Sequence, residues 1–245
     1  MASCLVVQHV EPEGPYAIGD ALVEAGVAVD VRPVHRGAEL PADVADFDGM
    51  VVMGGPMSAV SDEGFPSRRA EIALLTEALG VGLPTLGVCL GAQLLALAGG
   101  GTVYPGAAGP EIGWAPVELT GQAADDPLLA GLPRRFSVLH WHGDTFDPPP
   151  AAALLAANAR YRSQAFRSGA RAWGLQFHLE IDHSAVSAFL ESFGTDAAAA
   201  GTTPEAIGTD TGAFLPVLEP VRTRVLTRFA ALVVAHDRQR LADPA

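Results

Sequence analysis

One stretch constrains this chain more than any other. Residues 83–100 read "LPTLGVCLGAQLLALAGG", with a cysteine between two glycines where a buried strand gives way to an apolar helix. The pattern Gly-x-Cys-x-Gly is the thiol counterpart of the nucleophile elbow, a sharp strand-to-helix turn that lifts one side chain out of the sheet. A cysteine kept only for packing needs no small residue two positions away on either side. The stretch therefore predicts a strand–turn–helix unit that presents Cys89 to a reactant.

The first half of the chain repeats this alternation of strand and helix. Runs rich in β-branched residues predict strands, and apolar residues at helical spacing predict helices. Alternation of this kind favours an α/β fold: a doubly wound, mostly parallel sheet with flanking helices, in a single domain. Ligands bind such sheets outside the carboxyl ends of the strands, where Gly55 and Cys89 fall. The predicted strands span residues 4–10, 27–34, 47–55 and 84–88, and the predicted helices span residues 15–26, 67–80 and 90–100.

In the second half of the chain, predicted strands and helices alternate less regularly. Residues 163–180 resemble a hairpin that returns to the sheet, and the chain becomes rich in alanine from about residue 182. The Gly/Thr-rich residues 194–210 predict a surface loop, and residues 218–240 a closing helix. We expect residues 1–185 to form the main domain and residues 186–245 to form a helical C-terminal extension packed on it.

Composition excludes several classes of function. The net charge is −13 and the 15 basic residues, all arginine, are scattered, so no nucleic-acid surface is expected. Without lysine, neither a lysine-containing phosphate loop nor a Schiff base can form. Two cysteines, Cys4 and Cys89, are too few for a disulfide framework. The start resembles no signal peptide, and no apolar run reaches the roughly 20 residues of a membrane span. We therefore expect a cytoplasmic protein with no membrane partner.

A thiol nucleophile needs a base, and a third group that orients the base. The segment "WGLQFHLEI" supplies His178 and Glu180 two positions apart at the end of a predicted strand, so both side chains point to one face. Acyl chemistry also needs donors for an oxyanion. The candidates are the backbone N–H of Leu90, at the start of the helix, and that of Gly55, in the tight "MGGPM" turn.

The chain contains three motifs around these candidate residues: Gly54-Gly55-Pro56, Gly87-Val88-Cys89-Leu90-Gly91-Ala92-Gln93 and Gln176-Phe177-His178-Leu179-Glu180. Together they resemble the signatures of the class I (triad-type) glutamine amidotransferases. The resemblance implies a flavodoxin-like fold and cysteine-dependent hydrolysis of a γ-glutamyl amide through a γ-glutamyl thioester, with no cofactor. A further segment, "HWHGDTF", resembles the Ser-His-Gly-Asp region of the GMP synthetase amidotransferase domain.

The same resemblance implies a role for each matching residue. Cys89 attacks, His178 exchanges the proton and Glu180 orients His178, while Gly55 and Leu90 form the oxyanion hole. A small γ-glutamyl substrate is implied, together with an ammonia-consuming synthetase subunit as partner. Trp141 replaces a small residue of the GMP synthetase version, which predicts a reshaped pocket. The implied substrate-binding residues are Gln93, Trp141, His142, Gly143 and Asp144.

Alternatives remain open at this point. Stand-alone relatives include γ-glutamyl peptide hydrolases, so a peptide or amine can replace ammonia as the leaving group, and a non-catalytic regulatory protein is a third hypothesis. His140 and His142 have the spacing of two metal ligands, but no cysteine or carboxylate set is near them in sequence, so no metal is expected. We expect Glu111 to be structural, and His9 either to reach the crevice or to lie in a solvated loop.

Overall fold

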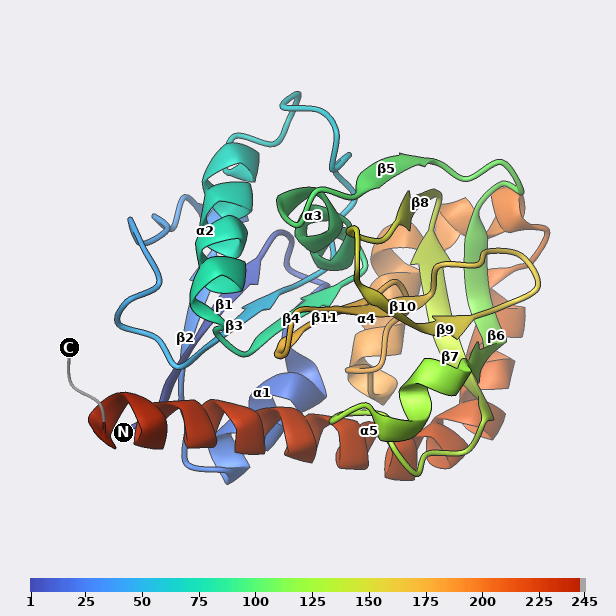
Figure 1. The fold of residues 1–245 in the computed structure, drawn as a ribbon. Helices are drawn as coiled ribbons and strands as arrows, with labels where there is room; N and C mark the ends of the chain where they lie inside the picture. The colour runs from blue at the N-terminus through green and yellow to red at the C-terminus, as the bar shows by residue number, and fades with distance from the viewer. Residues whose placement is uncertain (243–245) are drawn as a thin grey trace.

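The computed structural model describes residues 1–242, and most of its strands form one nine-stranded sheet (Figure 1). Across the sheet the order is β2 (Ala28–Pro33), β1 (Ser3–Gln8), β3 (Gly49–Val52), β4 (Thr85–Val88), β11 (Ala172–Leu175), β10 (Ala165–Ser168), β9 (Ala153–Ala157), β6 (Glu111–Leu119) and β7 (Arg135–His142). Two short strands, β5 (Thr102–Pro105) and β8 (Asp144–Asp147), form a separate ribbon.

The sheet has a parallel half and an antiparallel half. Strands β2, β1, β3, β4 and β11 are parallel neighbours and form the central sheet that the sequence predicts. Beyond β11, the neighbouring strands pair antiparallel, and β10 with β11 is the predicted hairpin. The carboxyl ends of β3 and β4 meet at one edge, which places the turns after both strands side by side.

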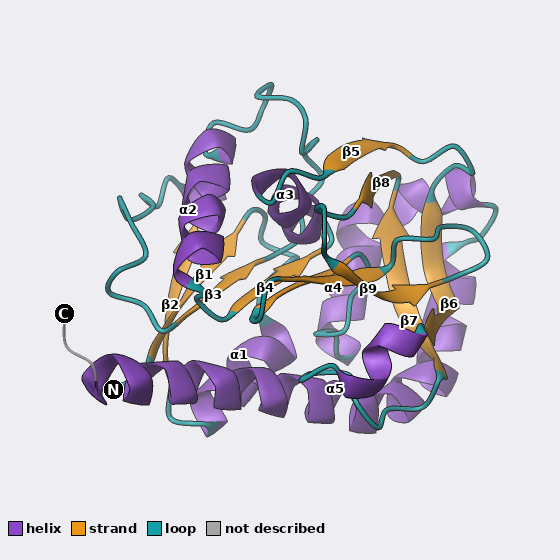
Figure 2. Ribbon diagram, in the orientation of Figure 1, coloured by secondary structure: helices purple, strands orange, loops and turns teal. Residues whose placement is uncertain are grey.

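Helices cover both faces of this sheet, so the doubly wound architecture is confirmed (Figures 1 and 2). Leu5 and Val7 of β1 pack into the core under α2 (Arg68–Val81) and α3 (Leu90–Ala98). Cys4 and Val6 point the other way, into the core shared with α1 (Tyr16–Glu24), α4 (His183–Phe193) and α5 (Pro204–Ala242). This alternation is what a strand buried on both faces requires. Within residues 1–242, none of the helices combines the length and the apolar character needed to cross a membrane.

The C-terminal part differs from the prediction. Most of residues 194–210 are not a loop: they form the 3₁₀-helix η3 (Gly194–Ala200) and the first turns of α5, which begins well before residue 218, with residues 201–203 as a short turn between them. Local composition is a weak guide here because tertiary packing decides. Ile207 and Thr211 are buried, and Thr211 accepts a hydrogen bond from the indole of Trp114 at 2.9 Å. The boundary at residue 185 stays a prediction.

Candidate active site

Cys89 lies at the junction of β4 and α3, with φ 51° and ψ −106°. A positive φ is rare and strained for a residue with a side chain, and it persists only where the surroundings hold it. One such support is the Cys89 N–H, which donates to the carbonyl of Leu175 at 2.8 Å. This is the turn geometry that the Gly-x-Cys-x-Gly pattern predicts.

The flanking glycines are required by close backbone contacts. A Cβ on Gly87 would lie 2.4 Å from the carbonyl oxygen of Gly91, and a Cβ on Gly91 would lie 2.0 Å from that of Val52. Backbone atoms cannot rotate away as a side chain can, so no larger residue fits at either position. The spacing of the motif therefore follows from how tightly α3 packs against β3 and β4.

His178 and Glu180 form a buried pair, with His178 Nδ1 2.7 Å from Glu180 Oε1. The pair does not lie on a strand as predicted, because β11 ends at Leu175. It lies on the following segment, which is held by the His178 N–H donating to the carbonyl of Leu139 at 2.8 Å. Among the described residues, the buried Nε2 of His178 has no hydrogen-bond partner, so it is available to a reacting group.

These side chains shift the protonation of one another. Burial alone would lower the pKa of His178, but the charge of Glu180 and the neighbouring Cys89 raise that pKa well above its ordinary value. Burial raises the pKa of the Cys89 thiol, and His178 opposes this rise. The imidazole can therefore hold a proton beside the thiol, which is the condition for a reactive thiolate.

Cys89 faces a cavity of about 560 Å³, in the size range of small-molecule sites. Leu90, the first residue of α3, has a backbone N–H with no partner inside the helix. Leu90 lies beside Gly55, because a Cβ on Gly55 would be 3.0 Å from Leu90 Cδ2. The cavity wall includes the predicted residues Gly55, Gln93, Trp141, His142, Gly143 and Asp144.

Two glutamines connect the thiol to the predicted substrate residues. The Gln93 amide donates to Gln176 Oε1 at 3.2 Å and to the carbonyl of Asp144 at 3.4 Å. Gln176 Nε2 lies 3.8 Å from Cys89 Sγ, and the thiol donates to the carbonyl of Trp141 at 3.6 Å. Gln176 belongs to a quoted motif, yet the sequence does not single it out as a neighbour of the thiol.

The ring of Trp141 packs on aromatic side chains from α4. Its centroid lies 5.7 Å from that of Phe189 and 6.4 Å from that of Phe193. Phe193 also lines the cavity, as do Asp196 and Ala199 of η3. The predicted C-terminal extension therefore supplies part of the cavity wall.

Comparison with known proteins identifies the family of this site. The family model described as "Glutamine amidotransferase class-I" matches residues 14–196. The chain belongs to the class I glutamine amidotransferases. A putative glutamine amidotransferase-like protein of Salmonella typhimurium is 32% identical over 171 residues, which cover 69% of this chain and 71% of that protein. A glutamine-hydrolysing GMP synthase of Thermomicrobium roseum is 40% identical over 181 residues, but these cover 68% of this chain and only 31% of the synthase.

A solved structure matches almost the whole length of this chain. The crystal structure of a glutamine amidotransferase from Thermotoga maritima superposes with a TM-score of 0.84 at 30% identity, covering 94% of this chain and 98% of that one. The flavodoxin-like fold and the family predicted from the three motifs are confirmed. The chemistry of the family is glutamine amide transfer and hydrolysis.

The amidotransferase site contains a carboxyl group that the sequence did not reveal. Glu13, on the loop after β1, lines the cavity, is only 5% exposed, and has no hydrogen-bond partner for its Oε2 among the described residues. A Cβ on Gly54 would lie 1.8 Å from this oxygen and 3.2 Å from Cε1 of His178, so the carboxyl group lies close to the imidazole. Burial raises the pKa of Glu13 to about 7. The one feature of the sequence that could have indicated Glu13 is its position just after a predicted strand whose carboxyl end faces the crevice.

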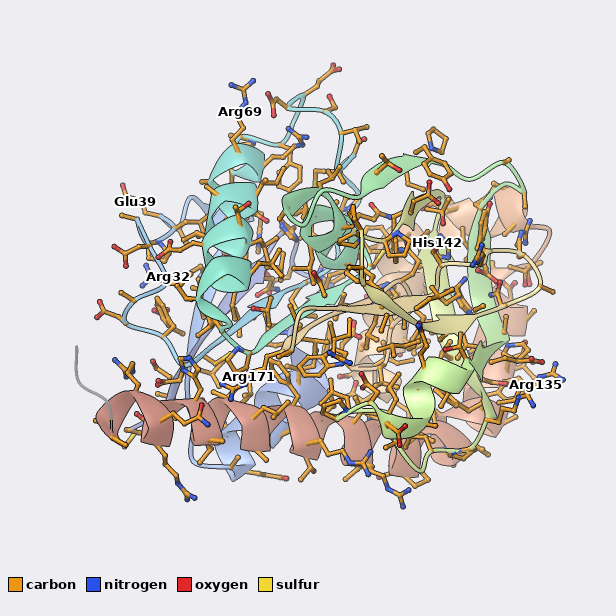
Figure 3. All side chains as sticks on the ribbon, viewed as in Figure 1. Arg32, Glu39, Arg69, Arg135, His142 and Arg171 are labelled. Carbon is orange, nitrogen blue, oxygen red and sulfur yellow. The ribbon has the colours of Figure 1, made fainter. Side chains whose placement is uncertain are left out.

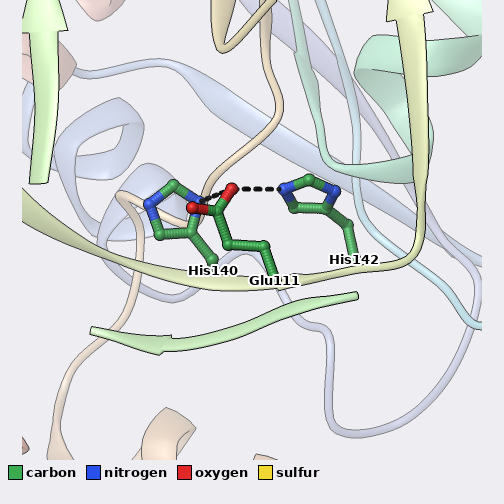
Figure 4. A group of neighbouring side chains, drawn as sticks. All are labelled: Glu111, His140 and His142. Atoms are coloured by element: carbon green, nitrogen blue, oxygen red, sulfur yellow. Dashed lines mark hydrogen bonds and ion pairs between the residues drawn. The ribbon is translucent and has the colours of Figure 1, made fainter. Parts of the chain in front are cut away.

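Glu111 lies between His140 and His142 (Figure 4). Its Oε2 is 3.4 Å from His140 Nδ1 and 3.2 Å from His142 Nε2. Glu111 is distant from these histidines in sequence, and the register of β6 with β7 places it opposite His142. Two imidazoles and a carboxylate are a donor set that can hold a metal ion. That this protein uses no metal stays a prediction.

Hydrogen bonds hold this cluster in place. His142 Nδ1 is 2.9 Å from the carbonyl of Asp144, which can only accept, and Nε2 faces the Glu111 carboxylate. Glu111 also accepts hydrogen bonds from Asn158 at 2.7 Å and from Gln164 at 2.8 Å. Glu111 thus braces the turn after β7.

His9 is buried rather than solvated. Its Nε2 lies 2.7 Å from Glu71 and its Nδ1 lies 2.9 Å from the carbonyl of Gly54. His9 therefore supports the turn that carries Gly54 and Gly55.

Proposed function

We propose that this amidotransferase hydrolyses a γ-glutamyl amide, with Cys89 as nucleophile, His178 as general acid and base, and Glu180 as the group that orients His178. One observation carries the proposal: Cys89 occupies a positive-φ turn that opens into the cavity, and a buried imidazole–carboxylate pair lies next to it. Family chemistry agrees with these roles.

The reaction follows from these positions. Sγ of Cys89 attacks the carbonyl carbon of the side-chain amide, and the thiol proton passes to Nε2 of His178. The backbone N–H groups of Gly55 and Leu90 stabilise the oxyanion. When the C–N bond breaks, the leaving amine takes the proton from His178 and a γ-glutamyl thioester remains. Water then attacks the thioester, with His178 accepting its proton and returning it to sulfur, which releases glutamate.

The glutamyl end of the substrate binds at Gln93 and along the turn from Trp141 to Asp144. Backbone groups and the Gln93 amide offer donors and acceptors for its α-amino and α-carboxylate groups. A site that reads these groups rejects substrates that lack them, because its own polar atoms would be left unpaired.

The fate of the amine has two candidates. The Thermomicrobium roseum relative is a GMP synthase of which this chain matches less than a third, which supports transfer of ammonia to a synthetase partner. Alternatively, the protein acts alone on a γ-glutamyl peptide or amine, or on glutamine as a glutaminase. A regulatory protein without activity is disfavoured because all three reacting side chains are present and adjacent.

A diazo-ketone analogue of glutamine tests the proposal. Mass spectrometry of the treated protein is expected to find one adduct, on Cys89, and an excess of substrate is expected to prevent it. Cys4 is an internal control, because it is fully buried and burial raises the pKa of its thiol far above the ordinary value. An unlabelled Cys89, or equal labelling of both cysteines, contradicts the proposal.

A further inference from the structure

We propose that the leaving-group side of the cavity binds a cation, so that the preferred substrate is the γ-glutamyl amide of an alkyl amine carrying a second, positively charged nitrogen. This inference rests on the proposed hydrolysis and specifies its substrate class.

Acidic side chains line the cavity, whereas arginines do not. Three carboxylates line it, those of Glu13, Asp144 and Asp196, and none forms an ion pair with an arginine of residues 1–242. None of the lining residues is an arginine. Arg69 and Arg135, labelled in Figure 3, lie at the outer edge of the molecule. A cleft lined by negative charge attracts positively charged ligands and repels anions.

Of the three carboxyl groups, Glu13 gives the strongest support for a bound cation. It is 5% exposed, it lines the cavity, and its Oε2 is buried without a partner in the described chain. Burial disfavours the charged form of this group, and a cation brought by the substrate would stabilise that form. Glu13 also lies against His178, which gives its proton to the departing nitrogen, so it faces the leaving-group side of the reaction.

The rest of the wall fits an alkyl chain. Apolar surface there favours methylene groups, which lose contact with water when they pack on it. Asp196 is exposed on η3 and therefore lies at the rim, where a terminal ammonium group can reach it. An amino acid as leaving group would instead bring a carboxylate toward these acids. The apolar lining residues include Met57, Val60, Ile112, Trp141 and Phe193.

Three isosteric substrates test the inference. The γ-glutamyl amides of diaminobutane, pentylamine and aminopentanoate, each attached through its terminal nitrogen, share the same methylene chain and end in an ammonium, a methyl or a carboxylate group. We expect kcat/KM to fall in that order, by about fivefold or more per step, as for a partly exposed charge pair. Added salt is expected to narrow the differences, because it screens the charges.

Two variants locate the effect and one controls for it. Glu13→Gln and Asp196→Asn are expected to reduce the ratio of kcat/KM for the diaminobutane amide to that for the pentylamine amide. Asp210→Asn is the matched control: it removes one charge from an exposed residue of α5 that does not line the cavity, and is expected to leave the ratio unchanged.

The outcomes separate the inference from the proposed function. Cleavage of the pentylamine amide without preference for the ammonium end, or a ratio that neither Glu13→Gln nor Asp196→Asn alters, overturns the inference and leaves the hydrolysis standing. Failure to cleave any γ-glutamyl amide, glutamine included, together with no adduct on Cys89, overturns the proposed function and the inference with it.

Discussion

The cavity has two walls of different origin. The reaction wall consists of Gly55 and Cys89, which line the cavity, backed by Leu90 and His178. It lies at the carboxyl ends of the parallel strands and depends on backbone turns. The selectivity wall, formed by Trp141, Phe193 and Asp196, comes from the antiparallel half and the C-terminal segment and depends on side chains. The reaction wall leaves no space for a Cβ at Gly87 or Gly91, whereas side chains on the selectivity wall can be exchanged. We infer that bond breaking and choice of amine are controlled separately.

Cys89→Ala is the strongest test of the reaction wall. We expect hydrolysis of every amide to fall by about 10,000-fold or more, because the nucleophile is lost, as in other enzymes with a covalent intermediate. The fold should remain, since alanine keeps the Cβ and the substitution removes one sulfur atom. Steady-state rates and a circular dichroism melt measure both. Substantial turnover by the purified variant would mean that another group attacks.

His178→Ala and Glu180→Gln compare two roles within the same wall. In the proposed mechanism His178 moves the proton, whereas Glu180 lies 2.7 Å from the ring and raises its pKa, so the histidine variant should lose at least about tenfold more activity. Parallel kcat/KM measurements across pH check this. Since the charge of Glu180 is lost, the limb of the Glu180→Gln profile that reports His178 should move to lower pH. A worse defect in Glu180→Gln would reverse the assigned roles.

Trp141→Ser sharpens the comparison from the other side. The indole packs on Phe189 and Phe193, so its loss enlarges the cavity at the selectivity wall. The ranking of leaving groups by kcat/KM should change by about tenfold, and more than the rate with any single small substrate, because the lost contact is apolar area. Trp114→Ser is the control, since Trp114 does not line the cavity and should leave the ranking unaltered. Equal loss on all substrates would place Trp141 with the reaction wall.

Glu13→Gln tests, through protein stability, the carboxyl group that lies beside the reaction wall. Burial raises the pKa of Glu13 from 4.5 to about 7, so between these values the folded protein holds a proton that the unfolded chain releases. The contribution of Glu13 to the free energy of unfolding is therefore complete below pH 4.5 and is lost as the pH rises through about 7. Glu13→Gln should lack this decline. Denaturant melts at several pH values measure the difference, and parallel curves for both proteins would refute it.

Local spacing made the reaction wall predictable. The elbow needs glycine on both sides of Cys89 because neighbouring backbone approaches it, and this requirement is written within five consecutive residues. The His178–Glu180 contact is likewise local, so the two-residue spacing brings the groups together even though β11 has already ended. The parallel half of the sheet was also predictable from local patterns, because strands and helices alternate along the first half of the chain.

Distant contacts explain what the sequence could not predict. Glu111 meets His142 across 31 residues through strand register, and His9 meets Glu71 across 62. Glu13 belongs to no motif, and only the packing of its loop over Gly54 buries it. Residues 194–210 have the composition of a loop, but buried contacts on α5 make them helical.

The position of η3 along the chain has a consequence for inheritance. Phe193 and Asp196 follow Glu180, the last residue of the three motifs, so part of the cavity is encoded after the whole reacting apparatus. Recombination or sequence drift confined to that end would change which leaving amines the cavity accepts. The strained turn that carries Cys89 would be inherited unchanged. Diversification among such proteins should accordingly concentrate behind the final motif.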